Sequence, residues 1–196
     1  MAAANRSAPS SSRSMLADRF QERHDLEQYF WTEATVKRLT QALEGIKEGE
    51  ICCLTTPSLA HAFYFQHQRT ELLLDVDTRF RYLPGFRYFD LRMPASLGSE
   101  RDHPMSVIVF DPPFFYIPLE VLFEAVTSIT KNRANCKLVL GFLRREEAAL
   151  LRVFKSFELK PTKFVLEYAT VKPNKWRNYT LYSNVDLPCI KRITKP

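Results

Sequence analysis

Short apolar runs without a polar face recur along this sequence, and they constrain the fold more than any other feature. Residues 51–54, 72–74 and 107–110 are apolar at successive positions, whereas a strand with one wet face would alternate. Strands that are apolar on both faces belong to parallel sheets that helices cover on both sides. The sequence therefore predicts an α/β fold built on a mostly parallel sheet.

Helical patterns fill the segments around these strands. Val36, Leu39 and Leu43 have helical spacing, and Thr32 precedes them as a candidate cap. A second helix is expected from a cap at Ser58 to about Gln68. Further helices are predicted over 119–130 and 145–154, further strands over 86–89 and 136–142, and a terminal hairpin from the alternating runs 163–171 and 177–184.

The 196 residues are enough for one ordinary domain with a sizeable core. We expect residues 1–24 to form a disordered, Ser-rich N-terminal tail and residues 25–196 to form a single domain. No apolar run approaches the ~20 residues that span a bilayer, so a soluble protein without a membrane partner is expected.

The cysteines and histidines show no metal-ligand spacing, so no metal site is predicted. We interpret the four cysteines as reduced core residues of an intracellular protein, cytoplasmic or nuclear. The formal net charge of +6 is compatible with a polyanionic partner, although many proteins of this charge never contact nucleic acid.

Three successive strands end in an acid, at Asp75, Asp90 and Asp111. Ligands of open α/β sheets bind beyond the carboxyl ends of the strands, so these side chains are expected to line one pocket. Each acid alone could equally be a turn residue or a helix cap. Together they suit a ligand with a ribose diol, which an acid after the second strand typically binds, and with an adenine amine, which the next acid can receive.

The turn after the first strand reads "TTPSLA" and contains no glycine. Dinucleotide sites need glycines there, because the backbone must approach the pyrophosphate closely. A dinucleotide cofactor is therefore disfavoured. S-adenosyl-L-methionine has adenine, ribose and a cationic end but no pyrophosphate, and it fits an acid-lined pocket.

The stretch "VFDPPFF" places Asp111, Pro112, Pro113 and Phe114 directly after a buried strand. The prolines fix φ, lack N–H groups and hold the backbone extended with its carbonyls available. An acceptor carboxylate, an acceptor carbonyl and an aromatic face suit a flat group that bears an amine. Two acceptors can stabilise the positive charge that develops on the amine nitrogen during methyl transfer, and holding the amine in line adds a proximity effect.

The DPPF sequence is similar to the signature of class I amino-directed methyltransferases. With "QYFWTEAT", "CCLTTPSL" and "LLLDVDTRF" in the same order and spacing, residues 25–185 resemble the eukaryotic N6-adenine methyltransferase-like family. That family includes elongation-factor lysine methyltransferases, a zinc-finger-bearing ribosomal RNA adenosine methyltransferase and proposed DNA adenine methyltransferases. The resemblance implies a Rossmann-like domain that uses S-adenosylmethionine, with a seven-stranded sheet and a C-terminal antiparallel hairpin.

The resemblance also implies roles for individual residues. The segment Asp111–Phe114 would be catalytic, with Asp111 as its acid. Asp75 or Asp77 would bind the ribose of the cofactor, and Asp90 would bind its adenine. The cofactor would further contact the family's "TP" turn and its aromatic stretch, which correspond here to Thr56, Pro57, Tyr29, Phe30 and Trp31. The aromatic stretch could instead be a hydrophobic staple on the first helix.

The preferred substrate is the N6 amine of adenine in DNA or RNA. The first alternative is a lysine of elongation factor 1A, and the second is a non-catalytic nucleic-acid-binding subunit. The four cysteines of the chain cannot form the zinc-finger modules of the RNA enzyme, so any RNA recognition that those modules provide is absent. The lysine methyltransferases of the family usually have tyrosine at the position of Phe114. The phenylalanine of this chain therefore favours adenine as the substrate.

A basic segment near the C-terminus is a candidate contact for nucleic acid. Lys172, Lys175 and Arg177 surround Trp176, and this combination offers charge for phosphates and a ring for stacking. The alternative is a solvated loop whose tryptophan packs back on the sheet.

Overall fold

The computed structural model describes residue 16 and residues 19–46, 49–94, 105–131 and 136–194. Within them, seven strands form one sheet in the order β3-β2-β1-β4-β5-β7-β6. The strands are β1 Glu50–Leu54, β2 Leu72–Asp75, β3 Phe86–Tyr88, β4 Met105–Phe110, β5 Lys137–Leu143, β6 Lys160–Pro161 and β7 Tyr179–Ser183. The first five pair in parallel and the last two join antiparallel, which confirms the predicted fold class.

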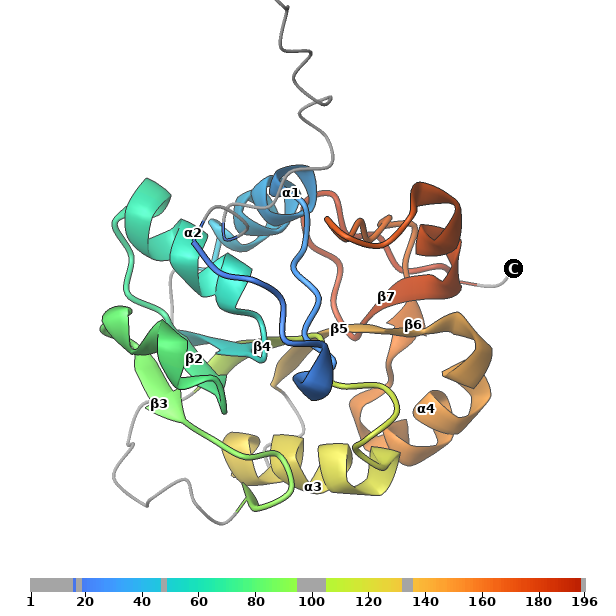
Figure 1. The fold of residues 1–196 in the computed structure, drawn as a ribbon. Helices are drawn as coiled ribbons and strands as arrows, with labels where there is room; N and C mark the ends of the chain where they lie inside the picture. The colour runs from blue at the N-terminus through green and yellow to red at the C-terminus, as the bar shows by residue number, and fades with distance from the viewer. Residues whose placement is uncertain (1–15, 17–18, 47–48, 95–104, 132–135, 195–196) are drawn as a thin grey trace, which may run out of the picture.

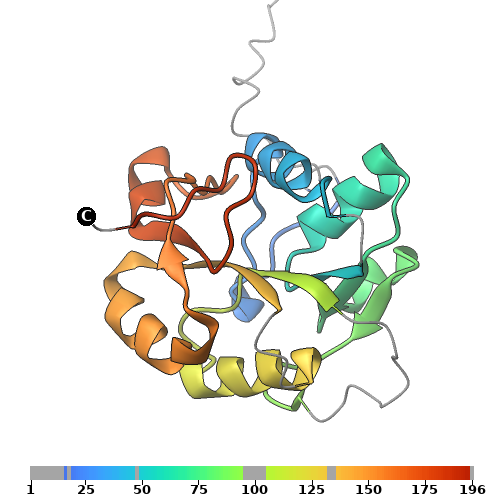
Figure 2. The same cartoon turned by 180° about the vertical axis from the view of Figure 1, so that it is seen from behind.

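Two helices cover each face of the sheet (Figures 1 and 2). Helices α1 (Glu33–Leu43) and α2 (Pro57–His67) lie on one face, and α3 (Leu119–Thr130) and α4 (Glu147–Val153) lie on the other. Side chains of neighbouring residues in one strand pack on opposite faces of the sheet. Cys53 packs with the α1–α2 side, whereas Cys52 packs with the α3–α4 side. This division explains why the central strands carry no polar face.

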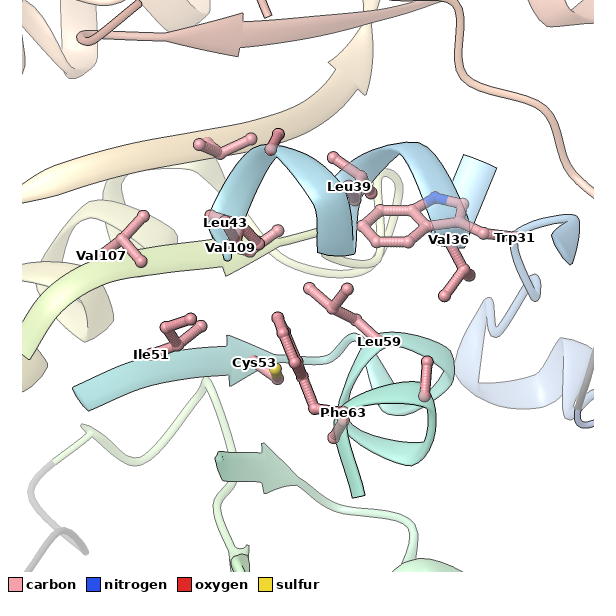
Figure 3. Close-up of a cluster of buried hydrophobic side chains, with 14 of the residues drawn as sticks. Trp31, Val36, Leu39, Leu43, Ile51, Cys53, Leu59, Phe63, Val107 and Val109 are labelled. Atoms are coloured by element: carbon pink, nitrogen blue, oxygen red, sulfur yellow. The ribbon is translucent and has the colours of Figure 1, made fainter. Parts of the chain in front are cut away.

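The core on the α1–α2 side joins the first two helices to the sheet (Figure 3). Cys53 and Val109 point from β1 and β4 towards Leu39 of α1 and Phe63 of α2, and all four are fully buried. Trp31 lies in the same cluster, just before α1 begins. The chain that enters α1 is thus fixed against the sheet.

The starts of the first two helices are set by their caps. The Thr35 N–H donates to Thr32 Oγ1 at 3.2 Å, so the predicted cap of α1 is confirmed. Helix α2 begins two residues earlier than predicted, because Pro57 occupies its first turn and Thr56, not Ser58, is the N-cap residue. Proline suits that position since its fixed φ is helical and its missing N–H costs nothing.

The C-terminal antiparallel pair forms, but its first strand is Lys160–Pro161 rather than residues 163–171. Residues 163–171 run beside the segment that leads into α1. The Thr32 N–H donates to the Glu167 carbonyl, and the Ala169 N–H donates to the Phe30 carbonyl, both at 2.9 Å. The alternation in this run is real, but it pairs with the N-terminal segment. This pairing brings Tyr168 to the edge where the strands end.

The folded part begins before residue 25, earlier than predicted. Leu16 is fully buried, and the Phe20 ring packs edge-on against Phe80 at 5.5 Å between centroids. One carboxylate oxygen of Glu22 accepts from the Phe30 N–H at 2.7 Å. Residues 1–15 and 17–18, which make up most of the predicted tail, lie outside the described residues.

Two other sequence expectations concern cysteines and membranes. All four cysteines are free, and three are buried as predicted, but Cys189 is exposed. In the described part of the chain, no helix has the length and apolar character needed to cross a bilayer.

Candidate active site

A cavity of about 400 Å³ lies beyond the carboxyl ends of the parallel strands. This volume falls in the range of small-molecule sites, roughly 300–1,000 Å³. Asp75, Asp90 and Asp111 all line it, as the sequence predicted. The other lining residues come from the N-terminal wall, the turn after β1, the ends of β2 and β3, the loop after β4 and one C-terminal tyrosine: Asp25, Leu26, Glu27, Gln28, Tyr29, Thr55, Pro57, Val76, Phe89, Leu91, Arg92, Pro112, Pro113, Phe114, Tyr116, Ile117 and Tyr168.

Asp111 faces the cavity from the end of β4. Desolvation by the surrounding protein raises the pKa of its carboxyl to about 8, although the hydrogen bond from Tyr168 opposes the shift. The Tyr168 hydroxyl donates to Asp111 Oδ1 at 2.9 Å. The buried Trp31 nitrogen has no partner within hydrogen-bond distance among the described residues. Asp111 Oδ1 is thus held by a tyrosine at the wall of the cavity.

Gly141 makes room for the Asp111 carboxyl. It lies within β5, opposite Leu181 of β7. A Cβ at this position would stand 2.7 Å from Asp111 Oδ1 and 3.1 Å from a Leu166 methyl carbon. Any side chain here would therefore push the carboxylate or the leucine aside. A glycine inside a strand often marks such a close approach, but the sequence alone did not indicate what approaches.

The turn after β1 takes a left-handed conformation without glycine. Thr55 has a φ of 54°, and its hydroxyl donates to the Leu54 carbonyl at 2.7 Å and to the Asp111 carbonyl at 3.0 Å. Thr55 therefore ties the first turn to the DPPF segment, a contact that sequence reasoning missed. Of the two predicted turn residues, Pro57 lines the cavity. Thr56 is buried beneath it, and its hydroxyl donates to the Val109 carbonyl.

Of the two candidate ribose-side acids, Asp75 lines the cavity and Asp77 does not. Asp75 lines the cavity, and burial raises its pKa to about 7. Asp77 lies outside the lining and is occupied by a salt bridge from Arg79 at 2.6 Å and a hydrogen bond from Gln28 at 3.0 Å. Burial of Asp77 works to raise its pKa, but these hydrogen bonds outweigh it and lower the pKa. Asp77 anchors the N-terminal wall, and Asp75 is the acid available to a ligand.

Asp90 lines the cavity between the apolar side chains of Phe89 and Leu91. Its carboxylate pairs with the exposed Arg92 guanidinium at 2.7 Å. The hydrogen bond from Arg92 lowers the pKa of Asp90, so this acid is charged at neutral pH. Asp90 therefore remains an acceptor at the cavity wall.

The predicted aromatic contacts divide between cavity and core. Tyr29 lines the cavity, whereas Phe30 and Trp31 are each 2% exposed and belong to the hydrophobic core. The cofactor contact expected of Phe30 and Trp31 is therefore not what the structure shows. Both side chains pack beneath the wall, because the neighbouring extended segment 163–171 covers them. For Phe30 and Trp31, the structure is closer to the alternative in which the aromatic stretch is a hydrophobic staple on the first helix.

The wall at residues 25–29 was largely missed by sequence reasoning. Glu27 has a φ of 51°, and its carboxylate accepts from the Phe115 N–H at 2.9 Å and the Tyr116 N–H at 3.1 Å. This contact joins the wall to the loop that follows the DPPF segment. No sequence pattern around Glu27 indicates its left-handed backbone or its contact with the loop after the DPPF segment.

The basic C-terminal segment forms a short 3-10 helix, η7 (Pro173–Asn178). Lys172, Lys175 and Arg177 are exposed. The Trp176 indole N–H donates to the Val171 and Tyr168 carbonyls at 2.9 and 3.2 Å, and its ring packs partly against the core. The three cations are thus available to a partner, while Trp176 packs back on the domain.

Comparison with known proteins identifies the family. Residues 22–186 match the family model described as "Probable N6-adenine methyltransferase". The chain belongs to this family. It is therefore a methyltransferase of the S-adenosylmethionine-dependent class I type, in agreement with the sequence resemblance.

Known proteins similar to this methyltransferase include a protein-lysine N-methyltransferase of Caenorhabditis elegans. The two are 25% identical over 163 residues, which cover 74% of each chain. Among solved structures, a Thermoplasma acidophilum protein has a TM-score of 0.45 at 15% identity, covering 81% of this chain and 88% of its own. The E. cuniculi Mtq2–Trm112 complex, described as methylating the termination factor eRF1, has a TM-score of 0.44 at 18% identity, covering 80% and 96%.

Substitution of Gly141 by alanine is expected to lower the turnover of the enzyme on the order of tenfold, because the Asp111 carboxylate must move to avoid the new Cβ. The matched control is Gly45→Ala, since nothing lies within 4 Å of a Cβ built at that residue. Steady-state kinetics of both variants checks the prediction. Equal turnover for the two would show that Asp111 needs no such space.

Proposed function

We propose that this enzyme transfers a methyl group from S-adenosylmethionine to the N6 amine of adenine in a nucleic acid. The observation that carries the proposal is the DPPF segment at the cavity edge, with Asp111 held by Tyr168 and exposed cations on the neighbouring elements. The family description supports the same substrate atom. Family membership together with an intact acid in the cavity speaks against a non-catalytic subunit.

The residues that line the cavity fit the cofactor by their chemistry. Asp75 offers acceptors for a ribose diol, and Asp90 offers acceptors for an adenine amine between two apolar side chains. Tyr29 and Pro57 complete the walls. The bound cofactor supplies an electrophilic methyl group on a positively charged sulfur, and a cavity lined by five acidic side chains favours that charge.

The chain's own residues hold the amine and receive its proton. Asp111 and the Pro112 carbonyl accept hydrogen bonds from the two amine hydrogens. The Phe114 ring, which packs against Phe142 at 5.5 Å and Tyr179 at 5.6 Å, gives the flat base an aromatic wall. As the methyl–sulfur bond breaks and the new N–C bond forms, positive charge would develop on the amine nitrogen, and the Asp111 carboxylate would stabilise this charge and then accept the proton.

A basic rim beside the cavity suits the phosphates of a nucleic acid. We define it as Arg144 and Arg145 of the 3-10 helix η5 (Arg144–Glu146), together with Lys172, Lys175 and Arg177. All five side chains are exposed, and η5 lies in contact with η7. The rim stands at the same edge of the sheet as the cavity, because Leu143 at the end of β5 pairs with Tyr179 at the start of β7. Arg145 also pairs with Glu146 at 3.4 Å, an exposed contact that a phosphate can displace.

A protein lysine is the second candidate substrate, and three observations favour it. The Caenorhabditis elegans relative is a protein-lysine N-methyltransferase. The cavity lining also contains five acids and one arginine, which suits a cationic side chain. A lysine must lose a proton before it attacks, and the raised pKa of Asp111 suits a proton acceptor.

In the test, the purified enzyme is incubated with S-adenosylmethionine that carries a labelled methyl group and with each of three kinds of substrate. These are adenine-containing DNA and RNA oligonucleotides, the same oligonucleotides with hypoxanthine in place of adenine, and total cell protein. We expect label in the adenine oligonucleotides and none in their hypoxanthine counterparts, which lack the N6 amine. Label in protein alone would replace adenine by lysine as the substrate.

A further inference from the structure

Two aromatic side chains stand exposed in the loop that follows the DPPF segment. Phe115 and Tyr116 are each 67% exposed, the highest values among the described large hydrophobic side chains. They are adjacent in the chain, so both apolar side chains emerge from the same short stretch of this loop. Contiguous exposed apolar surface commonly marks a contact with a partner molecule.

The backbone beneath these rings is held firmly. The Glu27 carboxylate accepts from the N–H groups of both Phe115 and Tyr116, at 2.9 and 3.1 Å. Hydrogen bonds to a charged acceptor are stronger than those between neutral groups. The rings therefore project from a fixed loop, so little ordering entropy remains to oppose binding of a partner.

The two rings lie between the cavity and the basic rim. Tyr116 is part of the cavity lining. The Arg145 guanidinium lies over the Phe115 ring, 5.4 Å from its centroid. Arg145 belongs to η5, which contacts η7, and η7 carries the exposed Lys175 and Arg177. A path of aromatic and then cationic groups thus leads outward from the cavity.

We propose that Phe115 and Tyr116 form a stacking platform for the base next to the target adenine, and that the substrate is an unpaired strand. This inference rests on the proposed function. In a duplex, the N6 amine of adenine is hydrogen-bonded to the partner base. The amine can therefore reach Asp111 only after the adenine has left the base stack. The platform replaces the stacking that the neighbouring base loses, and the basic rim holds the phosphates of the strand.

The experiment uses a single-stranded oligonucleotide with one adenine and the fluorescent base 2-aminopurine beside it. Stacking on an aromatic ring quenches this fluorophore. We expect quenching with the wild-type enzyme and little with Phe115→Ala, whose KM for the strand should rise about tenfold while kcat changes less than about twofold. A complementary strand that pairs the adenine should raise the wild-type KM as well.

Two further variants separate stacking from general damage. Phe115→Trp keeps a ring and should restore both the quenching and the KM. Phe65→Ala removes an aromatic side chain that is 51% exposed on α2 and lies outside the cavity lining, and it should behave as wild type.

The outcomes distinguish the two proposals. Methylation of adenine with an unchanged KM and full quenching in Phe115→Ala overturns the platform and leaves the proposed function standing. Equal KM values for single strand and duplex overturn the inference that the substrate is unpaired. Methyl transfer to lysine with none to any adenine oligonucleotide overturns both proposals together.

Discussion

Substitution of Asp111 by alanine is expected to lower methyl transfer by a factor on the order of 10²–10³ while the protein still folds. The variant loses the acceptor that stabilises the charged amine and receives its proton, and removal of one such group costs on the order of 10²–10³ in rate. The Tyr168 hydroxyl also loses its partner at the cavity wall. Initial rates with saturating cofactor, together with circular dichroism, measure the two parts of the prediction.

Two companion variants make this result specific. Asp111→Asn keeps an acceptor oxygen for Tyr168 but loses the charge, so it should fall between wild type and alanine. Asp186→Ala removes an exposed acid whose partner is Arg192, outside the cavity lining, and it should retain full activity. If Asp111→Ala kept activity within about threefold of wild type, the DPPF carboxylate could not be the catalytic acceptor.

The raised pKa values of Asp111 and Asp75 also predict how stability depends on pH. Their pKa values are about 8 and about 7 in the folded protein, against an ordinary value of 3.8. Between about pH 4 and pH 8 the unfolded chain therefore binds fewer protons at these groups than the folded one. The free energy of unfolding must then fall as pH rises through this window, by up to about 1.4 kcal/mol per pH unit for each group.

Thermal unfolding of Asp111→Asn isolates the contribution of Asp111. Without cofactor, the variant should unfold at a higher temperature than wild type at pH 8, and the difference should shrink towards pH 4. The cationic methyl donor favours the charged carboxylate, so its addition should narrow the difference at pH 8. A variant that is less stable than wild type at pH 8 would contradict the desolvated state of this carboxyl.

Substitution of Asp75 by asparagine is the second change with a large expected effect. It should weaken S-adenosylmethionine binding about 100-fold, because a charged acceptor for two hydroxyl groups becomes a neutral one with a single acceptor oxygen. The fold should persist, since the asparagine oxygen can still accept the Asp77 N–H, as Asp75 Oδ1 does at 2.8 Å. Isothermal titration with the cofactor and with its demethylated product measures the change.

The control for this prediction is Asp186→Asn, which removes the same charge outside the cavity. It should bind cofactor as wild type does. Unchanged affinity in Asp75→Asn would instead mean that the ribose-side acid lies elsewhere, with Asp90 as the next acid of the lining to test.

The sequence was sufficient for those parts of the fold and site that depend on local pattern. Apolar strands without a polar face predicted the parallel sheet, and acids at strand ends predicted which side chains meet in the cavity. This worked because parallel strands bring their carboxyl ends to one edge, so position along each strand determines position in the site.

The remaining features depend on contacts between distant segments, which no local pattern specifies. Residues 163–171 alternate like a hairpin strand but pair with residues 30–32, and this places Tyr168 against Asp111. Gly141 has no local turn to explain it, and only the packed structure shows the carboxylate that needs its space. Trp176 was equally ambiguous, because a tryptophan beside cations can stack on a ligand or pack on the domain.

Identification of the methylated atom tests the central claim most directly. Adenine-containing single strands are incubated with the enzyme and cofactor, digested to nucleosides and analysed by mass spectrometry against authentic standards. The account predicts N6-methyladenine with the wild-type enzyme and none above background with Asp111→Ala. Methylation of a ring nitrogen, or methylated protein lysine with unmodified adenine, would contradict it.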